Sequence, residues 1–99
     1  MDIRTATDQL RAKVGEDCGL GAVLKFDCGP DGAIVVDATK VPNELSNDAD
    51  CVADCTVALG VDTLGDLLSG ELEPTTGFMM GKFKVSGDMS VALKLQRIV

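Results

Sequence analysis

Apolar and polar residues alternate along three stretches of this chain, with the two-residue period of a strand buried on one face. These stretches are residues 20–28, 33–39 and 51–59. A GPDG sequence at residues 29–32 separates the first two and has the proline and glycine positions of a tight turn. The pattern therefore predicts a β-hairpin, a short edge strand at residues 41–45 that Pro42 limits, and a further strand at residues 51–59.

Other segments show the three-to-four-residue spacing of amphipathic helices. The first is expected to begin after Asp2 as its N-cap and to end at Gly15, and its apolar face holds Ile3, Ala6, Leu10 and Val14. A second, short helix is expected to have Asp62 as its N-cap and to end at Gly70. It gathers three leucines, Leu64, Leu67 and Leu68.

The last quarter of the chain predicts a short helix, a strand and a closing helix. Pro74 suits the first turn of the short helix, and Gly81 is a natural terminator. The strand at residues 82–86 places Phe83 and Val85 on one face. Asp88 is the predicted N-cap of the closing helix, whose apolar side holds Met89, Ala92, Leu93, Leu95 and Gln96. Three apolar faces therefore have to meet over one space.

Hairpins combined with helices gathered on one face predict an α+β fold. With 99 residues the chain is expected to form one domain over residues 1–99. Apolar residues make up 45% of it, but aromatic residues only 3%. Aliphatic and methionine side chains must therefore fill the interior, which makes it adaptable. Six glycines between residues 60 and 87 predict that the two short helices open easily and form a lid.

The net charge of −7 argues against nucleic acid as a partner, because such binding depends on neutralising phosphates. The charge is uneven, since residues 26–80 hold eleven acids and one base, whereas residues 81–99 hold four bases and one acid. Lys82 and Lys84 have two interpretations. They protect an edge strand, or they meet the anionic head group of a ligand.

Four cysteines suggest a metal or redox site, but their positions, 18, 28, 51 and 55, form no close Cys-x-x-Cys pair of the zinc-site kind. The absence of histidine also argues against a metal site and against an activated nucleophile. Cys51 and Cys55 are expected on one strand, about 13 Å apart, which is too far for a disulfide or a shared metal. The cysteines are best interpreted as buried hydrophobic residues. Asp48 and Asp50 are expected in a loop and Asp54 on the polar side of its strand, so all three are best interpreted as solvated acids and not as a catalytic site. We therefore expect no enzymatic activity, no metal and no cofactor.

No apolar run is long enough to span a membrane, and the amphipathic N-terminus does not resemble a signal peptide. The final residues do not form a peroxisomal address. We therefore expect a cytoplasmic protein without stable membrane insertion. The sequence leaves transient contact with a membrane open.

The last quarter of the chain resembles the C-terminal half of the sterol carrier protein type-two family, and the resemblance covers nearly the whole chain. The resemblance rests on an ordered combination, Pro74, Phe78, Gly81-Lys82-Phe83-Lys84-Val85, Gly87-Asp88 and Ala92-Leu93-Lys94-Leu95-Gln96. It implies a five-stranded, mainly antiparallel sheet with helices packed on one face, enclosing a hydrophobic tunnel. Phe83 departs from the family pattern, where a smaller aliphatic residue is usual, and is expected to narrow the tunnel.

The resemblance implies non-enzymatic binding and intracellular transfer of a fatty acid, fatty acyl-CoA, phospholipid, or sterol or isoprenoid-like molecule. The implied lining is Leu67, Leu68, Phe78, Met79, Met80, Phe83, Val85, Met89, Ala92, Leu93, Leu95 and Gln96. Lys82 and Lys84 are the candidates for a head group. The alternative is an accessory or scaffold domain that docks a partner protein of lipid or quinone metabolism in the same apolar groove.

Overall fold

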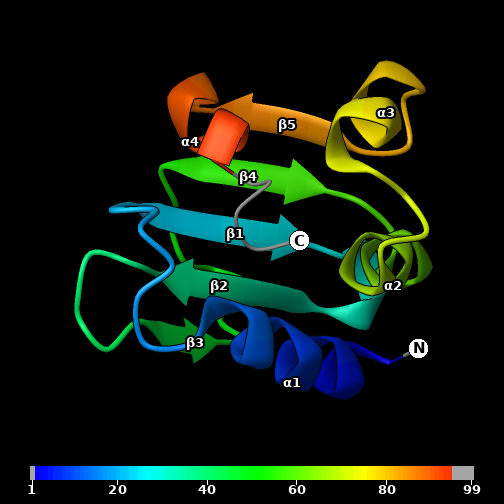
Figure 1. Ribbon diagram of the computed structural model, residues 1–99. Helices are drawn as coiled ribbons and strands as arrows, with labels where there is room; N and C mark the ends of the chain where they lie inside the picture. Colours follow the sequence, from blue (N-terminus) through cyan, green and yellow to red (C-terminus); the bar gives the residue numbers. More distant parts are fainter. Residues whose placement is uncertain (1, 95–99) are drawn as a thin grey trace.

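A five-stranded sheet with four helices forms the fold of this computed structural model, which describes residues 2–94 (Figure 1). The strands lie in the order β3-β2-β1-β4-β5. In chain order the elements are α1 (Ile3–Val14), β1 (Val23–Asp27), the 3₁₀ turn η1 (Gly29–Asp31), β2 (Ala33–Asp37), β3 (Glu44–Ser46), β4 (Cys55–Ala58), α2 (Val61–Ser69), α3 (Pro74–Met79), β5 (Lys84–Gly87) and α4 (Met89–Leu93).

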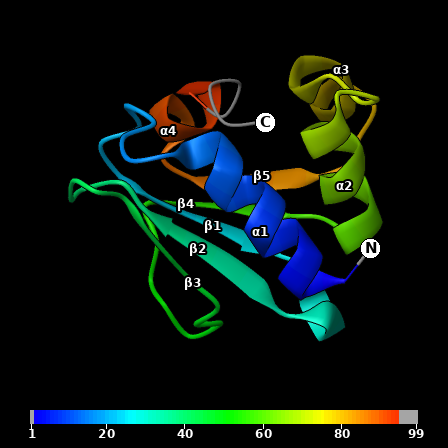
Figure 2. The same ribbon diagram turned by 60° about the horizontal axis from the view of Figure 1, so that its bottom comes forward.

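The sheet is antiparallel except at its centre, where β1 pairs in parallel with β4. The register of that pair runs from Leu24 opposite Cys55 to Asp27 opposite Ala58. All four helices lie on one face of the sheet (Figure 2). The predicted α+β fold, with a mainly antiparallel sheet and helices on one face, is confirmed.

Helix α1 forms as its sequence predicts. The Asp2 carboxylate accepts a hydrogen bond from the Thr5 backbone N–H at 2.8 Å, and Gly15 ends the helix with a positive φ of 62°. Ala6, Leu10 and Val14 are buried and join the core. The apolar face of α1 therefore packs against the core of the protein.

Strand β2 is buried on both faces, which its alternating pattern does not predict. Ile34 and Val36 face the helices as expected, but Ala33 and Val35 are buried as well. The segment between β3 and β4 crosses the opposite face of the sheet (Figure 2), where the Lys25 ammonium donates to the Ala49 carbonyl. This segment therefore covers part of the face that the helices leave open.

Strand β4 begins at Cys55, so the prediction that Cys51 lies in the strand is wrong. Residues 48–51 form a turn instead, in which the Cys51 N–H donates to the Asp48 carbonyl at 3.2 Å. Pairing with β1 starts only at Asp54, whose N–H donates to the Val23 carbonyl at 2.9 Å. A contact between residues so far apart in the sequence sets the start of this strand.

The predicted N-cap of α2 is also wrong. Gly60 occupies the capping position, and the helix begins at Val61, so Asp62 lies in the first turn. A carboxylate in the first turn still stabilises the helix through its dipole. The other end follows the prediction, because Gly70 adopts the left-handed conformation that terminates the helix.

Asp54 joins three strands at one point. Its carboxylate accepts the Val23 N–H at 2.9 Å, and its carbonyl accepts the Asp88 N–H at 2.7 Å. Gly87 packs directly against it, because a Cβ on Gly87 would lie 2.4 Å from the Asp54 carbonyl oxygen. The φ of Gly87 is also positive, at 95°. Only glycine fits where β5 ends against β4.

We expect the substitution Gly87→Ala to lower the free energy of unfolding by at least about 3 kcal/mol, because backbone strain and a backbone clash add together. Gly81→Ala is the matched control, since Gly81 also has a positive φ, 72°, but nothing lies within 4 Å of its added Cβ. Strain alone should cost about 1–2 kcal/mol there. Urea unfolding measures the free energy of unfolding of both variants. An equal decrease in the two would contradict the backbone clash proposed for a side chain at position 87.

Candidate functional site

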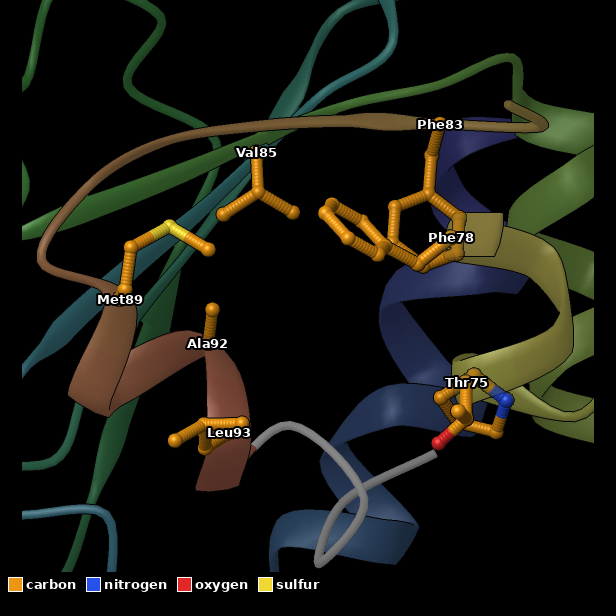
Figure 3. A pocket seen from close by; sticks show the side chains of 8 residues that line it. Thr75, Phe78, Phe83, Val85, Met89, Ala92 and Leu93 are labelled. Atoms are coloured by element: carbon orange, nitrogen blue, oxygen red, sulfur yellow. The ribbon is translucent and has the colours of Figure 1, made fainter. Parts of the chain in front are cut away.

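An apolar pocket of about 130 Å³ opens between α3, β5 and α4 (Figure 3). Side chains from the two helices and from the strand point into one space. They are Pro74, Thr75, Phe78, Phe83, Val85, Met89, Ala92 and Leu93. Among residues 2–94, no charged side chain lines the pocket, so this lining suits an apolar guest.

Local sequence signals position each wall of the pocket. Pro74 lies in the first turn of α3, where its missing N–H costs nothing. Asp88 caps α4 by accepting the Ser90 N–H at 2.9 Å, and hydrogen bonds from Ser90 lower the pKa of the Asp88 carboxyl. The strand period directs Val85 toward the helices, so that it faces both of them (Figure 3).

Phe78 and Phe83 form one end of the pocket. Their ring centroids lie 6.2 Å apart with the planes tilted by 47°, a favourable arrangement for two aromatic rings. Phe83 is only 5% exposed and belongs to the core, whereas Phe78 is half exposed. Gly77 allows this packing, because a Cβ there would lie 2.9 Å from the Phe83 ring. Phe83 therefore limits the pocket on its core side.

The other end of the pocket is open to solvent. Met89 and Leu93 line it and are nevertheless 51% and 74% exposed. Within residues 2–94 the feature is a short, open pocket, and the enclosed tunnel that the family resemblance implies stays a prediction.

The structure brings together half of the twelve side chains that the sequence analysis proposed as a lining. These are Phe78, Phe83, Val85, Met89, Ala92 and Leu93. Leu67 and Leu68 are buried in the core on α2, and Met79 and Met80 are exposed outside the pocket. Leu95 and Gln96 lie outside the described residues. Whether any of these side chains contacts a ligand stays a prediction.

Pro74 and Thr75 also line the pocket, although they were not predicted as lining residues from the sequence. The signal was present, because Thr75 precedes Phe78 by three residues and so lies on the same face of a helix. Lys82 and Lys84 are exposed beside the pocket but do not line it. Their role toward a head group stays a prediction.

Cys28 and Cys55 are buried, free thiols, as the sequence predicts. Burial raises the pKa of the Cys28 thiol to about 11, and the carboxylates of Asp31 and Asp27 add to the shift. Burial also raises the pKa of the Cys55 thiol. Both therefore stay protonated and unreactive at neutral pH. Cys18 and Cys51 are only partly buried, so burial holds for two of the four.

The acidic candidates have structural contacts. Asp48 accepts the Asp50 N–H at 3.0 Å within a loop, and Asp54 holds β1 and β5 as described above. Among residues 2–94, no group of three or more cysteine and acidic side chains is arranged to hold a metal ion. No helix in this part of the chain has the length and apolar character needed to cross a bilayer. The apolar pocket is the candidate site.

Comparison with known proteins shows which family this chain matches. Residues 6–99 match the model of the SCP-2 sterol transfer family. Sterol carrier protein 2 from Gallus gallus is 36% identical over 84 residues, which are 80% of this chain and 15% of the chicken protein. The chain thus spans a small part of the length of the curated relatives that it matches.

Solved structures share the fold. The crystal structure of sterol carrier protein 2 like 2 from Aedes aegypti has a TM-score of 0.82 at 19% identity and covers 98% of this chain and 95% of its own. The palmitated form of that protein in solution gives 0.70 at 22% identity, with 99% and 94% covered. A ubiquinone synthesis protein, UbiJ-SCP2, gives 0.62 at 20% identity, with 97% and 76% covered.

The shared fold and the match in sequence agree. The family resemblance seen in the last quarter of the sequence extends over nearly the whole chain. This chain belongs to the SCP-2 sterol transfer family.

Proposed function

We propose that this protein binds the apolar tail of a lipid reversibly, without covalent chemistry, in the pocket between α3, β5 and α4. The observation that carries the proposal is a pocket whose lining is apolar apart from Thr75 and which is open to solvent at one end. Burying a chain there releases water from both surfaces, at about 0.8 kcal/mol for each methylene. Membership of a sterol transfer family supports a lipid as the guest.

The size of the pocket favours a flexible chain over a rigid ring system. Its volume of about 130 Å³ is similar to that of an apolar cavity of about 150 Å³ that holds benzene. An acyl chain enters such a space by its end, whereas a sterol requires α3 and α4 to separate. The palmitated state of the Aedes relative supports a fatty acid or another acyl lipid as the ligand class.

The second candidate is docking of a partner protein of lipid or quinone metabolism. Docking of a protein requires an open groove and not a closed cavity. The pocket is open at the end where Leu93 is mostly exposed, which favours this candidate. The likeness to UbiJ-SCP2, a ubiquinone synthesis protein, is compatible with such a role. The chain matches only a small part of the length of its curated relatives. The activities of those relatives are therefore not transferred to this protein.

Three further expectations accompany the proposal. The protein acts as a non-enzymatic carrier, it works as one domain over residues 1–99, and it does so in the cytoplasm. The family supports a carrier role for the matched residues. The domain bounds and the location stay predictions from the sequence.

Titration with an environment-sensitive fluorescent fatty acid tests the proposal. We expect saturable binding that unlabelled fatty acid or acyl-CoA displaces. Leu93→Asp should weaken it about tenfold, because a charge replaces an apolar contact at the pocket. The control is Val52→Asp, since Val52 is 92% exposed and lies outside the pocket. If no lipid class binds, the carrier function fails, and the docking function becomes the better account.

The substitution Phe83→Leu tests whether this ring limits the pocket. In the wild type, affinity for fatty acids should rise about fourfold with each added methylene and then reach a plateau, once the chain fills the pocket. Removing part of the ring should move that plateau to longer chains, although stability falls. Phe26→Leu is the matched control, because Phe26 is fully buried in β1 and does not line the pocket. If the plateau of Phe83→Leu lies at the same chain length as in the wild type, the Phe83 ring does not limit the pocket.

We propose that the predicted lid consists of α3 alone. Helix α2 buries five residues, among them Leu64 and Leu67, whereas α3 buries only Gly77. We therefore expect backbone amides of α3 to exchange with solvent at least tenfold faster than those of α2 and β2. Hydrogen exchange measured by NMR checks this expectation. Equal protection of α3 and β2 would eliminate α3 as a lid.

A further inference from the structure

A methionine forms part of the mouth of the pocket. The chain has four methionines, of which Met1 lies outside the described residues. Met79 and Met80 are 80% and 63% exposed and lie outside the pocket, whereas Met89 lines it. The thioether of Met89 points into the space that Val85 also faces (Figure 3), and the side chain is 51% exposed. Met89 therefore faces both the cavity and the solvent.

An accessible thioether is a target for hydrogen peroxide, which oxidises it to the sulfoxide. The sulfur lone pair attacks one peroxide oxygen, so that an S–O bond forms and the O–O bond breaks. The departing hydroxide takes the proton from the transferred oxygen and leaves as water. No side chain of the protein has to act as a base in this step. The product is a polar side chain in place of a flexible apolar one.

Cysteine thiols, the other side chains that peroxide oxidises, do not line the pocket in the described part of the chain. Cys28 and Cys55 are buried, and their thiols stay protonated at neutral pH. Cys18 and Cys51 are partly buried, outside the lining. Within residues 2–94, Met89 is thus the one side chain of the lining that peroxide readily oxidises.

The backbone that carries Met89 is held in place. Met89 is the first residue of α4, and Asp88 before it caps the helix by accepting the Ser90 N–H at 2.9 Å. The Asp88 N–H in turn donates to the Asp54 carbonyl at 2.7 Å. A chemical change in the Met89 side chain is therefore accommodated by rotation of that side chain and not by movement of the helix start.

A sulfoxide at position 89 has two arrangements, and both weaken the binding of an acyl chain. If it stays in the lining, its oxygen lies against apolar atoms, since Thr75, the one polar side chain of the described lining, belongs to the opposite wall on α3. If it rotates into solvent, the pocket loses an apolar contact at its mouth. Oxidation and occupation of the pocket therefore oppose each other.

We propose that Met89 is an oxidation site through which hydrogen peroxide empties the pocket. Peroxide converts Met89 to the sulfoxide, the affinity for the acyl chain falls, and the lipid leaves. Methionine sulfoxide reductases reverse the change with two thiols, which become a disulfide as the oxygen leaves in water. The inference rests on the proposed function, because it adds regulation to the same pocket. Met79 and Met80 are oxidised as well, without effect on binding, since neither lines the pocket.

Fatty acid binding measured before and after peroxide treatment tests the inference on the full chain. We expect the affinity of the wild type for a saturated fluorescent fatty acid to fall about tenfold, the effect of one unpaired polar group in an apolar lining. Each variant is compared with itself before treatment. Met89→Leu forms no sulfoxide at this position, so peroxide should change its affinity by less than about twofold. A loss as large as that of the wild type would overturn the inference.

The matched control removes the two methionines outside the pocket. Met79→Leu with Met80→Leu should lose as much affinity on oxidation as the wild type, because Met89 is still present. Circular dichroism before and after treatment establishes that each protein is folded. If the control variant keeps its affinity after treatment, the effect comes from Met79 and Met80, and the inference is wrong.

Peptide mass spectrometry locates the added oxygen. In the empty protein, Met89 should be oxidised along with Met79 and Met80. With palmitate at ten times its Kd, about a tenth of the protein has an empty pocket, so oxidation of Met89 should slow about tenfold. Met79 and Met80 should keep their rates. A Met89 that is not oxidised, or that palmitate does not protect, would overturn the inference.

Reversal distinguishes methionine from cysteine. Dithiothreitol alone reduces disulfides and sulfenic acids but leaves the methionine sulfoxide in place. Binding should therefore return only when methionine sulfoxide reductases for both epimers are added. Recovery with dithiothreitol alone would assign the effect to cysteine and overturn the inference.

The same measurements separate this inference from the proposed function. If the untreated wild type binds fatty acid and its sulfoxide form binds equally well, the regulation is overturned and the carrier function stands. If the untreated protein binds no lipid, the carrier function fails and the release step is overturned with it. Mass spectrometry then still decides whether Met89 is an oxidation site.

Discussion

The parallel pairing of β1 with β4 is the contact on which the rest of the structure depends. It joins a hairpin from the first half of the chain to the segment that carries the pocket. Asp54 fixes the point where this pairing begins. The Asp54 N–H donates to the Val23 carbonyl, and the Asp54 carboxylate accepts the Val23 N–H. Without this pairing, β4 and β5 would be separated from the other three strands, and α3 and α4 would have only a two-stranded ribbon to pack on.

The same residue connects the sheet to the site. The Asp54 carbonyl accepts the Asp88 N–H, and Asp88 in turn caps α4. The start of α4 is thereby held at a fixed place relative to β4 and β5. The opposite wall of the pocket has fewer anchors, since α3 buries only Gly77 and closes through the contact between two phenylalanine rings. We therefore expect α3 to be the wall of the pocket that moves more readily.

Several features predicted correctly from the sequence are set by neighbouring residues, although the local prediction of Asp62 as the cap of α2 is wrong. The helical spacing and Asp2 cap of α1, the Asp88 cap of α4 and the Pro74 start of α3 are all local, and all are found. The start of β4 was missed because it depends on Val23, which is distant in the chain. The burial of Val35 was missed for a similar reason, since a segment well after β2 covers that face.

Only part of the pocket lining was predicted from the sequence, because contacts between residues distant in the chain decide the rest. Periodicity indicates which side of an element is apolar, whereas the family resemblance implied that Phe78, Val85 and Met89 line a site. Periodicity does not indicate which apolar residues remain uncovered after packing. Leu67 therefore proved to be core, and Met79 to be exposed, although both are apolar residues of short helices.

Gly77 and Phe83 form a steric pair, because the ring of Phe83 occupies the space that a side chain at position 77 would need. Substitutions at the two positions are therefore not independent, and their energetic effects should not add. A larger residue at position 77 becomes tolerable only when position 83 becomes smaller. In sequences that diverge from this one, the size of the pocket and the approach of α3 to the sheet should consequently change together, as one inherited unit.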